Sequence, residues 1–212
     1  MKKINKNILR AFTLVETIVA IAIFALGIQA TTLVYTKTLK SKAYTLEMGK
    51  SSFIVSRSMG DIIDYLRKVR QSDAGARPIV SANDNDLVVY SDYDNDGKTE
   101  RLHIYLSNGI IYLGVRKPSA TIPKTYAAGD ATTVIIAKQI VNTSSDPMFS
   151  YYNKDYPEDV LHNPVSTPAN AADIRLIKIF LKINIDPNRA PDNIEQESFV
   201  ELRNLNDYDR IN

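Results

Sequence analysis

Acidic side chains at alternate positions form a segment whose spacing suits metal chemistry. Asp92, Asp94 and Asp96 are followed by Gly97 and, three positions later, by Glu100. Oxygen ligands at alternate positions, with a glycine where the chain bends sharply, are the arrangement that calcium prefers in proteins. The segment therefore matches the opening of a calcium-binding loop.

The same segment also suits a tight turn between two strands. A full calcium loop has a bidentate glutamate at its twelfth position, and His103 stands there instead. Aspartate and asparagine are frequent in turns because their side chains hydrogen-bond to the local backbone. Two interpretations stay open: an acidic hairpin tip, or a Ca²⁺ site with Asp92, Asp94 and Asp96 as ligands. If these residues bind calcium, the ion should raise the melting temperature of the domain that contains them.

No motif in the sequence supports catalysis, so we expect no enzymatic activity and no catalytic residues. The sequence lacks a Gly-x-Ser-x-Gly elbow and a His-Glu-x-x-His motif, and it contains no cysteine. Alternation places His103 on one strand face with Arg101 and Tyr105, where we expect a solvated histidine. Basic and acidic residues are interspersed in this region, so no nucleic-acid site is evident.

The amino-terminal part of the chain has a different character. Four basic residues and no acidic ones lie within residues 1–11, and 17 of the 24 residues from Phe12 to Tyr35 are apolar. Twenty uncharged residues separate Glu16 from Lys37, which is about 30 Å of helix and matches the hydrocarbon core of a bilayer. The basic residues favour a cytoplasmic amino terminus, so we predict one membrane span.

Three interpretations fit this segment. A secretory signal peptide would have a shorter apolar region and a cut after small residues such as Ala30, leaving a start at Thr31. A plain single-pass anchor has no need of Glu16, because a carboxylate in lipid costs about 2 to 4 kcal/mol at the centre and less near an interface. The third interpretation, a resemblance to a known protein family, gives Glu16 a function.

The string from Ala11 to Ile23 resembles the leader junction of type IV pilins and type II secretion pseudopilins. In that family a prepilin peptidase removes a short basic leader before a phenylalanine, the new amino terminus is methylated, and a glutamate lies five residues into the mature chain. Phe12 and Glu16 hold those two places. The family generally has glycine before the cut, whereas this chain has Ala11, the smallest replacement. The proline common in the apolar helix of major pilins is also missing, which favours a minor pilin or pseudopilin.

Glu16 gains a physical role if the apolar helices pack against one another. A buried carboxylate needs a partner, and the α-amino group of a neighbouring Phe12 is the natural one. Two unit charges about 4 Å apart interact by roughly 4 kcal/mol at an effective dielectric near 20. We therefore expect Glu16 to select subunit register during assembly.

The remaining sequence predicts a longer helix followed by an antiparallel sheet. No proline occurs before Pro78, and apolar residues recur with helical spacing between Tyr44 and Val69. The period then changes to that of strands. Strands are expected at 86–91, 98–107, 110–117, 132–142, 174–185 and 198–203. Residues 144–172 are expected to form a surface excursion, with a candidate short strand at 148–152.

Together these features predict an α+β protein with a pilin-like fold, in which a long amino-terminal helix packs on an antiparallel sheet domain. The expected divisions are a cleaved leader at 1–11, a membrane-spanning and assembly segment at 12–36, an amphipathic segment at 37–72 and the sheet domain at 73–212. The sheet region weakly resembles J-type pseudopilins and PilW-type minor pilins, through 92–106 and 200–204.

The resemblance implies a structural subunit of a type IV pilus or a type II secretion pseudopilus. It would start as a single-pass inner-membrane protein with an extracytoplasmic carboxy-terminal domain. Its partners would be the prepilin peptidase and methyltransferase, an inner-membrane assembly platform, and other subunits that pack through the same helix. The alternative is a monomeric membrane-anchored binding module, with calcium as a candidate ligand. Loss of residues 1–11 would leave 22 basic and 24 acidic side chains, a formal charge of −2 instead of +2.

Overall fold

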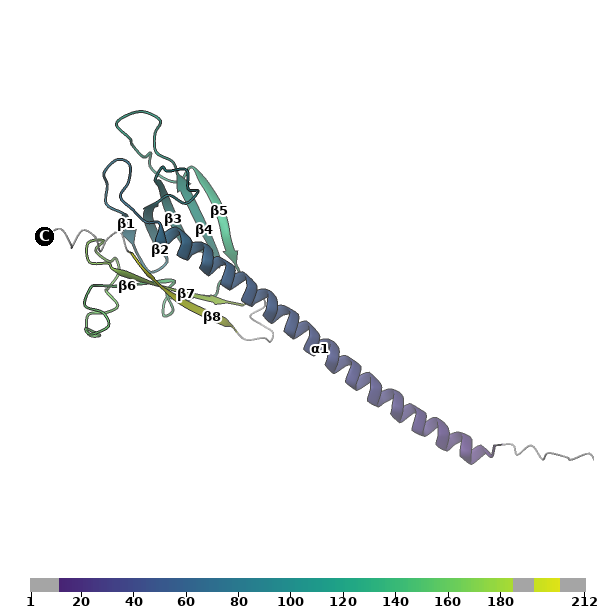
Figure 1. Cartoon of the computed structure of the whole chain (residues 1–212). Helices are drawn as coiled ribbons and strands as arrows, with labels where there is room; N and C mark the ends of the chain where they lie inside the picture. The colour runs from purple at the N-terminus through teal and green to yellow at the C-terminus, as the bar shows by residue number, and fades with distance from the viewer. Residues whose placement is uncertain (1–11, 185–192, 203–212) are drawn as a thin grey trace, which may run out of the picture. The chain divides into compact units, whose positions relative to one another are not determined.

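The computed structural model describes residues 12–184 and 193–202 of the chain (Figure 1). The predicted leader at 1–11, with Ala11, lies outside the described residues. The chain divides into two compact units, one ending at Leu46 and the other beginning at Glu47. Helix α1 (Leu14–Arg67) contributes to both units.

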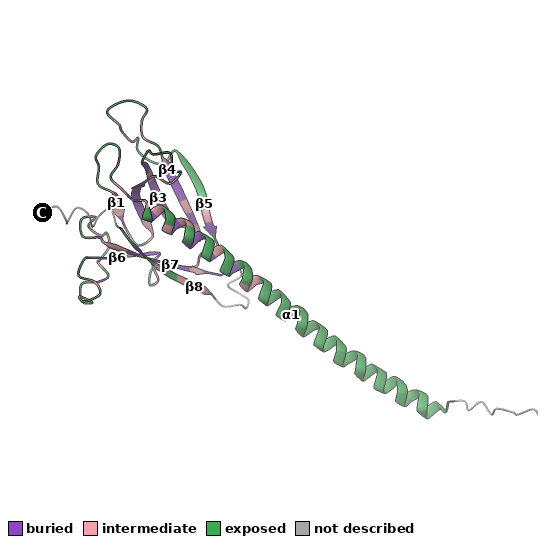
Figure 2. Cartoon of the chain, viewed as in Figure 1, coloured by how far each residue is buried: buried purple, intermediate pink, exposed green. Residues whose placement is uncertain are grey.

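The first unit, in its described part, is the apolar portion of α1. Every residue from Phe12 to Leu46 is exposed (Figure 2). Threonine hydroxyls in this portion donate to backbone carbonyls of the preceding turn: Thr31 Oγ1 to Gly27 at 3.1 Å and Thr32 Oγ1 to Ile28 at 2.8 Å. The helix therefore satisfies these polar groups internally and leaves its apolar side chains without cover.

The second unit contains the end of α1 and two antiparallel sheets. The first sheet has the order β1-β2-β3-β4-β5, and the second has the order β6-β7-β8. The strands in chain order are β1 (Ile79–Ala82), β2 (Asp86–Ser91), β3 (Glu100–Ser107), β4 (Ile110–Arg116), β5 (Thr132–Lys138), β6 (Phe149–Tyr152), β7 (Leu176–Ile183) and β8 (Ile194–Glu201). The chain is thus α+β, and the single sheet expected from the sequence is two sheets.

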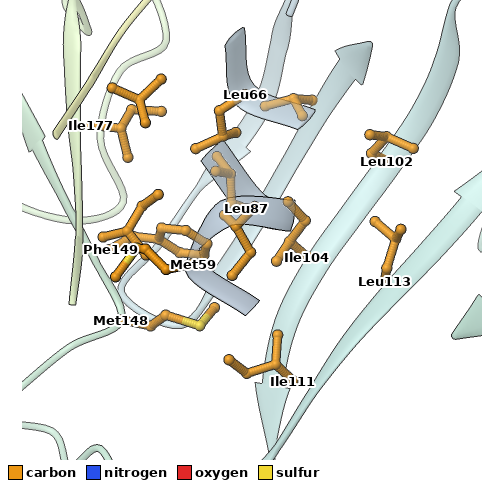
Figure 3. Packing of buried hydrophobic residues seen from close by; sticks show 14 of the residues in the cluster. Met59, Leu66, Leu87, Leu102, Ile104, Ile111, Leu113, Met148, Phe149 and Ile177 are labelled. Carbon is orange, nitrogen blue, oxygen red and sulfur yellow. The ribbon is translucent and has the colours of Figure 1, made fainter. Parts of the chain in front are cut away.

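One hydrophobic core joins α1 to both sheets. The end of the helix contributes Val55, Met59, Ile62 and Leu66, which lie on one stripe and are almost completely buried. Figure 3 shows Met59 and Leu66 with Phe149 and Ile177 of the second sheet on one side and with Ile104 of the first sheet on the other. Burial of this stripe confirms the predicted amphipathic period, although Tyr44, at its start, is exposed.

The helix ends at Arg67, five residues before the expected limit. Val69 forms a bridge to Ser91, and the Arg70 amide donates to the carbonyl of Tyr90 at 3.0 Å. Pairing with the end of β2 therefore captures these backbone groups and stops the helix. Strand β1 is not predicted from the sequence, because a four-residue strand carries little periodicity of its own.

Several strand predictions are confirmed with shifted ends. Strands β2, β3 and β4 form the expected three-stranded meander. Strand β7 buries one face, as its alternation predicts, through Ile177, Ile179, Leu181 and Ile183. The predicted excursion at 144–172 is only partly a surface segment. Met148, Phe149 and Tyr151 within it are fully buried, because β6 pairs with β7. Residues 185 and 203–204, which the predictions also covered, lie outside the described residues.

Candidate functional site

The turn between β2 and β3 gathers four acidic side chains. The Gly97 amide donates to Asp92 Oδ2 at 3.2 Å, and the Lys98 amide donates to Asp96 Oδ1 at 2.8 Å. Gly97 adopts a φ of 85°, a left-handed conformation that a glycine accepts without strain. One carboxylate oxygen each of Asp92, Asp94, Asp96 and Glu100 lies within 4.8 Å of the others. The three aspartates predicted from the sequence are therefore together, and Glu100 joins them.

Glu100 is the unusual member of this acidic cluster. It is the first residue of β3 and shares the buried face of that strand with Leu102 and Ile104. Its side chain is 0% exposed, and neither carboxylate oxygen has a hydrogen-bond partner among the described residues. Burial, followed by the charges of Asp94 and Asp96, raises the pKa of Glu100 to about 7. The fold thus places a carboxyl group where its charged form is disfavoured.

The two carboxylate oxygens of Asp92 lie in different environments. Its Oδ2 atom accepts the Gly97 amide and lies 3.5 Å from the Arg70 guanidinium, while its Oδ1 atom is buried without a hydrogen-bond partner among the described residues. Arg70 also donates to Thr99 Oγ1 at 2.8 Å and to the Gly97 carbonyl at 2.9 Å. Arg70 therefore holds the turn from outside and leaves one oxygen of Asp92 available to the cluster.

A lysine ammonium occupies the point where the other carboxylates converge. Lys117, just after β4, places Nζ 2.8 Å from Asp94 Oδ2, 3.4 Å from Asp96 Oδ2 and 3.9 Å from Glu100 Oε1. The hydrogen bond to Asp94 raises the pKa of Lys117, so the ammonium is charged at neutral pH. A tethered monovalent cation thus stands in the acidic cluster.

His103 lies in a different cluster on the opposite face of β3. Its Nε2 atom is 2.7 Å from Asp86 and its Nδ1 atom 2.9 Å from Asp130, and the ring stacks on Tyr105. The ring is half-buried, so the expectation of a solvated histidine is wrong. Its face of the strand, shared with Arg101 and Tyr105, is as expected. Because His103 binds Asp86 and Asp130, it does not complete the acidic cluster at position twelve.

The start of α1 is the second candidate site. Glu16 Oε2 accepts hydrogen bonds from the Thr13 amide at 2.9 Å and from the Thr13 hydroxyl at 3.0 Å, and the Glu16 amide lies 3.3 Å from Thr13 Oγ1. This reciprocal arrangement is a capping box, which satisfies amide groups that a helix start would otherwise leave unpaired. Phe12, directly before it, is 85% exposed.

The apolar helix has the dimensions of a membrane span. The stretch that begins at Leu14 is long and apolar enough to cross a bilayer, and its most apolar residues are not buried within the described part of the protein.

No protein-family model matches this chain, and a comparison with curated proteins finds no significant match.

Sequence reasoning missed the role of two residues in the acidic cluster. Glu100 was included in the calcium-loop pattern but not among its ligands. The alternation of β3 carried the missing signal, because it places Glu100 with Leu102 and Ile104 and not with Arg101. Lys117 had no such signal, since it comes from the far end of the next strand.

Proposed function

We propose that this chain is a structural subunit of a pilin-type filament, a minor pilin or pseudopilin, that is held in the membrane by α1 before assembly. The observation that carries the proposal is that every residue from 12 to 46 is exposed, and that the mostly apolar surface of 12–35 is covered by none of the described residues. Such a surface requires lipid or other apolar helices around it.

The same helix suits both environments. In lipid, threonine hydroxyls bonded to the preceding turn add little cost. In a filament, neighbouring copies of the helix replace the lipid and bury the same side chains. The helix therefore needs no refolding to pass from the membrane into an assembly.

Glu16 supports the proposal through its position and its free oxygen. Within the described part of the chain, its hydrogen bonds end on Oε2, which caps the helix through Thr13. The Oε1 atom remains for a neighbouring group. After cleavage before Phe12, the new amine of an adjacent subunit would be that group, and it would compensate the carboxylate as the apolar segments leave the lipid.

The decisive experiment is amino-terminal sequencing and mass spectrometry of the protein from producing cells. We expect a chain that begins at Phe12 and carries a methyl group on its α-amine. An intact leader would favour a monomeric anchor with an extracytoplasmic binding domain, and a start at Thr31 would indicate ordinary secretion; either result contradicts the proposal.

A second experiment separates capping from assembly. Glu16→Ala removes both functions of the carboxylate, whereas Thr13→Ala removes the hydroxyl partner and keeps the carboxylate. We expect both variants to enter the membrane fraction and only Glu16→Ala to disappear from sheared filaments. Normal incorporation of Glu16→Ala would contradict a role in register.

A further inference from the structure

We propose that the turn between β2 and β3 is a calcium-binding site in which the buried Glu100 is a principal ligand and Lys117 occupies the site in the calcium-free protein. Asp92 Oδ1, Asp94 and Asp96 supply the other carboxylate oxygens. The inference concerns the isolated chain and does not depend on filament assembly.

Glu100 is the observation that distinguishes this site from an acidic turn. A turn explains three aspartates that bond to their own backbone, because Asp94 and Asp96 both accept local amides. It does not explain a completely buried carboxylate with two oxygens that accept no hydrogen bond from the described residues. An unpaired buried charge is costly, and a cation bound beside it removes that cost.

The geometry also compensates for the missing glutamate at position twelve. His103 stands at that position and is engaged by Asp86 and Asp130 on the other face of the strand. Glu100 is three residues earlier and has both oxygens available, so it can supply the bidentate ligand that a calcium loop requires.

The ligand set favours calcium over magnesium. The ligand atoms of the four acidic residues lie within 4.8 Å of one another, inside the span of about 4.6–5.2 Å between oxygens on opposite sides of Ca²⁺. Calcium accepts many oxygen ligands in irregular geometry, whereas magnesium demands a near-ideal octahedron and keeps several of its waters. A cluster of carboxylates from a turn and a strand therefore suits calcium better.

Lys117 shows where a cation belongs. Its Nζ atom is within 4.0 Å of carboxylate oxygens on Asp94, Asp96 and Glu100. The side chain is about half exposed, so it can leave for solvent when a divalent ion enters. Calcium must displace it, and this competition weakens binding, so we expect a Kd of about 10⁻⁴ M.

The test is calcium binding by the full chain in detergent after treatment with a chelator. Calorimetry should give one site, and calcium at about 100 times the Kd should raise the melting temperature by about 5 °C or more. Terbium provides an independent probe, because Tyr93 lies within the turn and can sensitise its luminescence. Magnesium at equal concentration should give a much smaller shift.

Two variants and a matched control sharpen the result. Glu100→Gln removes the buried charge, so this variant should melt higher than the natural protein in chelator and lose most of the calcium shift. Lys117→Gln should bind calcium at least about threefold more tightly, because the competing ammonium is gone. Glu158→Gln, an exposed position outside the cluster, should behave as the natural protein does.

Three results would overturn the proposal. They are the absence of a calcium-induced shift in both the natural protein and Lys117→Gln, an undiminished shift in Glu100→Gln, and an equal response to magnesium. Filament assembly enters none of these measurements, so their failure leaves the proposed function untouched.

Discussion

Glu100 combines complete burial with a charge that the surrounding residues do not fully compensate. Its neighbours along β3 are core residues, so the same alternation that builds the core also carries a carboxylate into it. Three aspartates lie beside it, and Lys117 is the nearest cation. At this scale, the local sequence favours a turn, and the buried glutamate is the observation on which we propose a binding site there.

Protonation of Glu100 should make stability depend on pH in the metal-free protein. Its pKa in the folded protein is about 7, above its ordinary value of 4.5, so the folded state binds a proton more tightly than the unfolded state. The stabilising contribution of the protonated form is present at acidic pH and is lost as pH rises through 7.

The measurement compares Glu100→Gln with the natural protein in chelator across this range. The melting temperature of Glu100→Gln should exceed that of the natural protein only slightly at about pH 4.5, and the difference should be largest above about pH 7. Glu158→Gln is the control and should show no such trend. A gain that is the same at all pH values would contradict the assignment to Glu100.

Strand β4 shows how one element positions a cluster on each of its sides. Gly114 lies directly under the Asp130 side chain, which pairs with both Arg101 and His103. A methyl group at Gly114 would collide with the carboxylate of Asp130. Beyond the end of the same strand, Lys117 enters the acidic cluster. The hairpin thus brings together groups that are distant in sequence.

A pair of glycine substitutions tests this close approach. Gly114→Ala should displace Asp130 from its two partners and destabilise the protein by about 1–3 kcal/mol. Gly60→Ala lies within α1 at a site where an added Cβ meets nothing within 4 Å, so it should stabilise by about 0.5–1 kcal/mol. Thermal melting of the full chain measures both, and shifts of the same sign would contradict the argument.

At the scale of the whole molecule, the two compact units depend on different surroundings. The unit that ends at Leu46 exposes its apolar surface, and the unit that begins at Glu47 buries its own in a core shared by α1 and both sheets. Under the proposed function, lipid or other helices would cover the first unit, whereas the second is stabilised by its own core.

Shared packing predicts that the second unit unfolds cooperatively. Met59 is 2% exposed and belongs to the core that joins the sheets. Met59→Ala should cost about 2–5 kcal/mol and lower hydrogen-exchange protection in β3 and β7 together. Phe53→Ala, at an exposed position of the same helix, is the control and should change both little. Loss of protection in one sheet alone would show that the sheets unfold separately.

Periodicity and composition determined the elements that depend on local sequence: the apolar helix, its amphipathic continuation, the β2–β4 meander and the alternating face of β7. The Thr13–Glu16 capping box is equally local and was available from its spacing. Tertiary structure alone decided that the strands divide into two sheets, that Met148 and Phe149 enter the core, and that Lys117 meets the aspartates. These outcomes depend on contacts between residues far apart in the chain, because burial and ion pairing are set by which strands stack together and not by the order of residues along one strand.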